Sequence, residues 1–213
     1  MKKISERFET AALLALVIII ISALAGSTLC FARERGEIRD NTLRLHVMAN
    51  SDSDADQRAK LLVRDELLRK YSSQLRATDK DSAEDAVRAL LGEIERTANE
   101  TLRKNGCGCA ATAELVRMYF DEKDYDGFTM PAGMYDALRV KIGAAEGHNW
   151  WCVMFPPLCL PAAMDRDELA AELEERFGKE GLELLTKPKS PKYKARLAIV
   201  ELIERLLEKA EAR

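Results

Sequence analysis

Cysteine and histidine are the residue types best suited to metal binding or nucleophilic chemistry. This 213-residue chain has five cysteines and two histidines. A zinc site could be assembled from Cys107, Cys109, Cys152, Cys159 and His148. Zinc ligands commonly come as Cys-x2-Cys, however, whereas the first pair here has one residue between the thiols and the second pair has six. Disulfides form readily in proteins that leave the cytoplasm. We therefore favour a disulfide over zinc and expect no metal site.

Neither histidine belongs to a recognisable catalytic pattern. His46 falls on the polar side of an alternating segment and His148 lies in a turn, and the chain has no Gly-x-Ser-x-Gly elbow or glycine-rich phosphate loop. Carboxylates are abundant, so composition is compatible with an exported hydrolase that acts on cell wall or peptide. No two carboxylates, however, form a recognisable catalytic pair in the sequence. We expect a protein that is not an enzyme and has no cofactor. The formal net charge of −3 gives no indication of nucleic-acid binding.

The segment NWWCVMFPPLCLP holds both tryptophans of the chain and reads as a strand that is apolar on both faces and ends at two prolines. Adjacent strand residues point to opposite faces, so one tryptophan can fill a core while the other faces elsewhere. Aromatic residues and prolines at a strand end have the composition of an interaction hot spot. We predict that the contact or contact-supporting residues are Trp150, Trp151, Phe155, Pro156 and Pro157.

The N-terminal 32 residues read as a secretory signal or a single membrane anchor. A basic flank precedes a continuously apolar run from Ala11 to Ile21, and about 20 apolar residues span a bilayer. Both possibilities deliver residues 33–213 outside the cytoplasm, and the anchor would keep the protein at the membrane. Cleavage after Ala32 would leave four cysteines, which allow three pairings.

Hydrophobic periodicity predicts an α+β domain over residues 33–213, with helices packed on a small, mostly antiparallel sheet. Helices are expected at 55–75, from Ser82 to about Leu102, at 165–177 and at 193–210. Strands are expected near 43–48, 111–120, 137–142 and 150–155. The positions that should carry the site therefore lie at strand ends and in the connecting turns.

Arg64 and Asp65 fall inside the apolar stripe of the first expected helix. Buried charges are costly unless they are paired. Either the two side chains reach solvent along the helix surface, or they form a specific buried pair. We assign both a structural role, in holding the preceding turn or the core.

Three stretches resemble the stage II sporulation protein R family of endospore-forming bacteria. They are LRLHVMANSDSDADQRAKLLVRDELL, MPAGMYDALRVKIG and GHNWWCVMFPPLC, and YKARLAIVELIE is a weaker likeness. The resemblance implies a protein that is made in the forespore and exported into the space between the two cells. There it would activate a membrane-embedded aspartic protease of the mother-cell membrane, which processes pro-sigma-E. The family member is a ligand and has no catalytic residues to carry over.

Combining residues and resemblance, we expect a secreted signalling protein that touches the membrane only through its N-terminal segment. A Cys152–Cys159 disulfide would hold the shape of the contact segment. Asn50, Ser51 and Asp52 would form a structured turn beside it. The alternatives are the exported hydrolase and a membrane-anchored structural protein of the septum.

Overall fold

The computed structural model describes residues 29–71, 77–159 and 165–187, with isolated positions at 18, 19, 22 and 26. The chain divides into two units, Glu37–Thr186 and the two chain ends, Met1–Gly36 with Lys187–Arg213. Most of the apolar N-terminal run and the helix expected at 193–210 lie outside the described residues, and the expected boundary at residue 32 stays a prediction. Among the described residues, no helix combines the length and apolar character that a membrane crossing requires.

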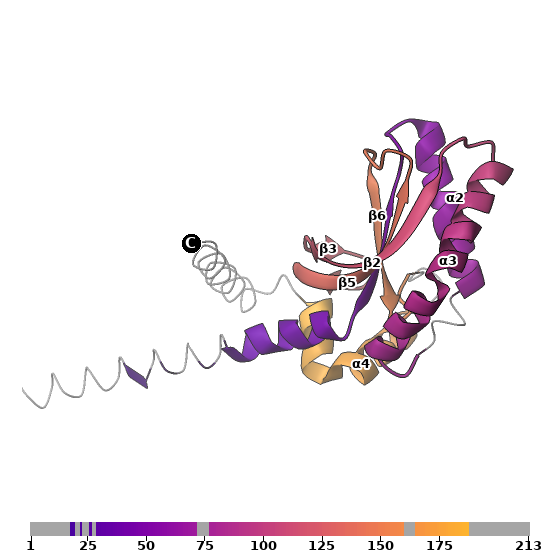
Figure 1. Ribbon diagram of the computed structural model, residues 1–213. Helices are drawn as coiled ribbons and strands as arrows, with labels where there is room; N and C mark the ends of the chain where they lie inside the picture. The colour runs from indigo at the N-terminus through magenta and orange to yellow at the C-terminus, as the bar shows by residue number, and fades with distance from the viewer. Residues whose placement is uncertain are drawn as a thin grey trace, which may run out of the picture. The chain divides into compact units, whose positions relative to one another are not determined.

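A four-stranded sheet forms the centre of the larger unit, with strand order β2-β5-β1-β6 (Figure 1). Its strands are β1 (Leu43–Met48), β2 (Ala111–Phe120), β5 (Gly133–Ile142) and β6 (Asn149–Phe155). The β2–β5 and β1–β6 pairs are antiparallel, whereas β1 and β5 are parallel. The α+β class is confirmed, and the sheet is mixed. The parallel pair arises because β1 inserts between β5 and β6, a choice of neighbours that hydrophobic periodicity does not encode.

Two long helices cover one face of the sheet, α2 (Asp54–Tyr71) and α3 (Lys80–Lys104) (Figure 1). The N-cap of α3 is Asp79, whose side chain accepts a hydrogen bond from the Ser82 backbone N–H at 2.8 Å. The core between helices and sheet includes Leu43, Leu45, Val47, Val63, Leu67, Val87, Ile94, Leu138, Val140 and Ile142. The strand residues and those of α3 are the alternating and helical positions that the sequence predicts, whereas in α2 the buried side includes Val63 and leaves Leu62 exposed.

Two smaller elements belong to the same unit. The loop expected after β2 contains a short hairpin, β3 (Lys123–Asp124) with β4 (Thr129–Met130). The helix α4 (Arg166–Thr186) is interrupted at Gly178, whose positive φ of 71° breaks the helix where the sequence predicts its end. A second helical piece then continues to Thr186.

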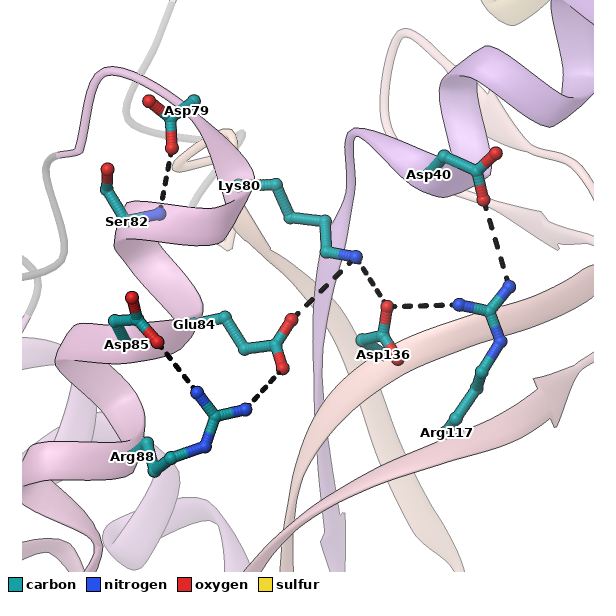
Figure 2. Close-up of polar contacts among 9 residues, drawn as sticks. All are labelled: Asp40, Asp79, Lys80, Ser82, Glu84, Asp85, Arg88, Arg117 and Asp136. Carbon is teal, nitrogen blue, oxygen red and sulfur yellow. Dashed lines mark hydrogen bonds and ion pairs between the residues drawn. The ribbon is translucent and has the colours of Figure 1, made fainter.

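A chain of ion pairs connects α3 to the sheet (Figure 2). Asp136 of β5 accepts a hydrogen bond from the Lys80 ammonium at 2.5 Å, and it pairs with Arg117 of β2 at 3.3 Å. Arg117 also lies 3.8 Å from Asp40. The side chains of Lys80 and Asp136 are only 11% and 16% exposed, so this pair is partly shielded from solvent.

Candidate functional site

Two turns meet at one end of the sheet, because β1 ends where its antiparallel neighbour β6 begins. Backbone hydrogen bonds join them, from the Gly147 N–H to the Ala49 carbonyl at 3.0 Å and from the Glu146 N–H to the Asn50 carbonyl at 3.3 Å. The Asn50 side-chain oxygen also accepts from the Ala144 N–H at 2.9 Å. We call residues 49–53 and 143–148 the joined turns.

Side chains of the 49–53 turn hold its shape. The Asp56 carboxylate accepts hydrogen bonds from the Asn50 amide at 2.8 Å and from the Ser51 hydroxyl at 2.6 Å. The Ser53 hydroxyl accepts a hydrogen bond from the Asp56 N–H at the start of α2, at 3.2 Å. The hydrogen bond from Ser51 is the main reason why the pKa of Asp56 is lowered. Asp56 is therefore the centre of the hydrogen bonds that hold the 49–53 turn.

The carboxylate of Asp52 connects this turn to the other one. It accepts from the His148 backbone N–H at 2.6 Å and also contacts the His148 ring nitrogen Nδ1. The backbone hydrogen bond is the largest cause of the lowered pKa of Asp52, so the carboxylate is ionised at neutral pH. Asp52 and His148 both remain exposed, and a partner can reach them.

The two glycines of the 143–148 turn leave no space for a side chain. A Cβ atom at Gly143 would collide with the Asn50 side chain, and one at Gly147 would collide with the Ser51 carbonyl. Gly143 also has a positive φ of 58°, which favours glycine. Close approach of the two backbones therefore depends on these positions.

Lys60 of α2 anchors the joined turns, a role that no sequence pattern indicates. Its side chain is buried, and its ammonium donates to the His148 carbonyl at 2.8 Å and to Gln57 Oε1 at 2.6 Å. Gln57 in turn donates to the Ser51 carbonyl at 2.9 Å. Burial lowers the pKa of Lys60.

Trp150 and Trp151 face opposite sides of the sheet, as strand geometry requires. Trp150 packs against the core beneath α2, and the Arg64 guanidinium lies 4.0 Å from the centre of its indole. Arg64 also donates to Asp65 at 2.7 Å, but the Asp65 side chain is 55% exposed. Arg64 is thus held by an aromatic ring, and the pair with Asp65 is not buried.

Trp151 belongs to an aromatic cluster on the other face. Its ring centre lies 5.5 Å from that of Phe120 and 5.9 Å from that of His46. The sequence placed His46 on a polar strand face, but its side chain is buried. His46 is buried because the rings of Phe120 and Trp151 cover that face. Burial, helped by the positive charges of Arg139 and Arg44 and opposed by the Asn149 side chain, lowers the pKa of His46 to about 4.

Arg44 lies fully buried in the same cluster. Its guanidinium is 4.6 Å from the centre of the Phe120 ring and 5.1 Å from that of Tyr135. It donates to the Cys152 carbonyl at 3.2 Å and to the Tyr125 hydroxyl at 2.7 Å. Strand alternation assigns Arg44 to the polar face, but the rings of Phe120 and Tyr135 and the loop that carries Tyr125 cover it.

The predicted Cys152–Cys159 disulfide is present, with 5.2 Å between the Cα atoms. It encloses Phe155 and Pro156, which are joined by a cis peptide bond and are both buried. Arg176 of α4 lies over the Phe155 ring at 5.2 Å. Phe155 and Pro156 therefore support the segment from inside, while Pro157 is exposed.

The predicted contact residues separate into two groups. Asn50, Ser51 and Asp52 lie at the start of β6, beside Trp150, whereas Pro157 lies beyond its end. At about 3.3 Å per strand residue, these ends are about 20 Å apart. Exposed, mutually hydrogen-bonded polar groups on a fixed backbone make the joined turns suited to recognition by another protein.

Comparisons with known proteins agree with this architecture. The model of the family described as stage II sporulation protein R matches residues 39–165, which include the sheet, α2, α3 and the disulfide. Stage II sporulation protein R of Bacillus subtilis (strain 168) is 37% identical over 123 residues, covering 57% of this chain and 55% of the relative. The chain thus matches about half the length of that curated relative. No solved structure matches significantly.

Proposed function

This chain belongs to the stage II sporulation protein R family, and we propose that it acts in sporulation as an exported signalling ligand. Its partner is a membrane-embedded aspartic protease in the mother-cell membrane. Binding of the ligand activates the protease, which then processes pro-sigma-E. The chain itself performs no catalysis and needs no cofactor, and residues 1–32 direct its export from the forespore or hold it at the membrane.

The joined turns are the observation that carries the ligand proposal. Their side chains are occupied with one another, since Asp56 holds Asn50 and Ser51 while Asp52 holds His148. The lowered pKa values of Asp52 and Asp56 keep both carboxylates ionised, and neither can serve as a general acid near neutral pH. These features fit a rigid recognition surface better than an active site.

Preorganisation gives such a surface its physical advantage. A turn that is already ordered loses little conformational entropy when a partner binds, so more of the contact energy appears as affinity. The stacked Arg64 and Trp150, the buried Lys60 and the nearby β1–β6 pairing all restrict the joined turns. Trp150 and Trp151 contribute by fixing the strand that leads away from this surface.

Co-expression in non-sporulating cells tests the proposal. This chain, the cognate membrane protease and pro-sigma-E are produced together, with and without residues 1–32, and processing is followed on a blot. We expect processing only when the exported chain is present. If the exported chain is folded and abundant yet no processing occurs, the ligand function is wrong and the hydrolase alternative returns.

Charge reversal locates the contact surface. Asp52→Lys, in the joined turns, should reduce processing about tenfold or more, as expected for a contact residue of an interface. Asp85→Lys on α3 is the matched control, because its carboxylate is also exposed but lies on the opposite side of the helix layer from the sheet. If Pro157→Lys impairs processing while Asp52→Lys does not, the contact lies at the other end of β6.

Trp151→Ala examines the aromatic part of the prediction. The variant must first be shown to fold and to be exported at the level of the parent chain, because Trp151 packs on Phe120 and His46. Full activation by such a variant would remove Trp151 from the contact set.

A further inference from the structure

Asp56, Cys107 and Cys109 meet beside the joined turns. One potential ligand atom from each, a carboxylate oxygen and two Sγ atoms, lie within 4.8 Å of one another. Cys107 and Cys109 are free thiols of intermediate exposure, in contrast to the disulfide-bonded Cys152 and Cys159. Cys152 and Cys159 are therefore not available to bind zinc, because they form the disulfide. Asp56, at the start of α2 and more than fifty residues earlier in the sequence, lies beside the two remaining thiols instead.

Local structure explains why Cys107 and Cys109 lie beside Asp56. The helix α3 ends at Lys104 with Asn105 as its C-cap, and Gly106 turns the chain with a positive φ of 74°. The Cys107 N–H donates back to the Leu102 carbonyl at 2.9 Å, which holds the following Cys-Gly-Cys stretch against the end of the helix. The first turn of α2 lies across from it and presents Asp56.

These three groups suit zinc. Tetrahedral zinc binds thiolates at about 2.3 Å and carboxylate oxygens at about 2.0 Å, so its ligand atoms lie roughly 3.5–3.8 Å apart. Closing the present cluster to that size requires side-chain movements of about 1 Å. Thiolates select thiophilic ions such as zinc over calcium and magnesium.

Space remains for a further ligand. The cluster lines a cavity of about 480 Å³ formed by the first turns of α2 and the loop at 105–109. Three protein ligands beside a cavity leave a fourth zinc position for water or for a group from another molecule.

We propose that Asp56, Cys107 and Cys109 bind one zinc ion whose fourth position faces the cavity. Binding displaces the thiol protons and forms two Zn–S bonds and one Zn–O bond without any change in oxidation state. Asp56 Oδ2 holds Asn50 and Ser51, so its other oxygen is the one that binds zinc. Zinc therefore fixes the carboxylate at the centre of the 49–53 turn. This inference does not depend on the proposed function.

Metal titration of the metal-free full-length chain, with Cys107 and Cys109 reduced and the Cys152–Cys159 disulfide intact, tests the site. Zinc is added in competition with a chromophoric chelator, and cobalt(II) is added separately to record thiolate-to-cobalt charge transfer and tetrahedral d–d bands. We expect one ion per chain. Cys107→Ser and Cys109→Ser should each weaken zinc binding at least 100-fold, whereas Cys30→Ser, which replaces an exposed thiol outside the cluster, should leave it unchanged.

Thermal unfolding tests whether zinc binding stabilises the fold around the 49–53 turn. Zinc at 100 times its Kd should raise the Tm of the parent chain by about 5 °C or more, and should not raise that of Cys107→Ser. Zinc binding that is equal in the parent and the Cys107→Ser/Cys109→Ser variant would overturn the proposal. A Cys107–Cys109 disulfide in protein isolated without reductant, with no zinc bound after reduction, would also overturn it. Unchanged affinity in a folded Asp56→Asn variant would exclude the three-ligand site.

Discussion

The Arg64 guanidinium of α2 lies 4.0 Å from the centre of the Trp150 ring of β6. The contact joins α2 to the strand that carries both tryptophans of the chain. The contact also explains why a charged residue, Arg64, lies in an apolar helical stripe. The guanidinium packs on the aromatic ring of Trp150, while its N–H groups stay near solvent.

Arg64→Ala should lower the free energy of unfolding by about 0.5–2 kcal/mol, through loss of the cation–π contact and of the packing of the side-chain stem. Chemical denaturation measures the change. Arg69→Ala is the control, because Arg69 lies on the same helix with a 70% exposed side chain and should cost little. Equal losses in the two variants would mean that the Trp150 contact contributes nothing.

Replacing both Cys152 and Cys159 by alanine should lower the free energy of unfolding by about 2 kcal/mol. The disulfide closes a short loop, with a sequence separation of 7, so it restricts the unfolded chain modestly. The parent chain should show a similar loss on reduction. The Cys30→Ala control should have the same free energy of unfolding as the parent chain. A variant that lacks both Cys152 and Cys159 and is as stable as the parent would contradict the prediction.

His46 should make stability depend on pH between about 4 and 6.5. Its pKa is lowered to about 4 by burial, so at pH 5 the unfolded chain binds a proton that the folded chain does not. Stability therefore falls as pH decreases through this window, by about 3 kcal/mol at most. Thermal unfolding at several pH values measures the slope.

Two variants separate the contribution of each histidine of the chain. His46→Phe should flatten this pH dependence, because phenylalanine keeps an aromatic ring beside Phe120 and Trp151 without a titrating group. His148→Gln should retain it, since His148 is exposed. A slope that survives in His46→Phe would assign the dependence to another group.

Asp136→Asn should destabilise the protein by about 1–3 kcal/mol, because it removes the nearer charged partner of the partly buried Lys80 ammonium and leaves Glu84 at 3.8 Å (Figure 2). Asp85→Asn is the matched control on the surface of α3, where the carboxylate is 77% exposed and the loss should stay within about 0.5 kcal/mol. Denaturant titration compares the two, and an equally small effect at Asp136 would contradict the expected shielding.

Local patterns were sufficient for most helices and strands. Alternation at Leu43, Leu45 and Val47 identified β1, and the apolar stripes identified α2 and α3, because these periods follow from backbone geometry alone. The proximity of Cys152 and Cys159 in sequence likewise allowed their pairing to be anticipated. Motifs that stay contiguous along the chain revealed the family.

Relations between distant segments were decided by the tertiary structure. The parallel β1–β5 pair, the burial of His46 and Arg44, and the meeting of Asp56 with Cys107 and Cys109 all depend on which elements become neighbours. A strand pattern states which residues share a face, but not what covers that face. For that reason the sequence by itself determined the elements and the family, and only packing decided which polar groups are buried, which are exposed and which stand close enough to act together.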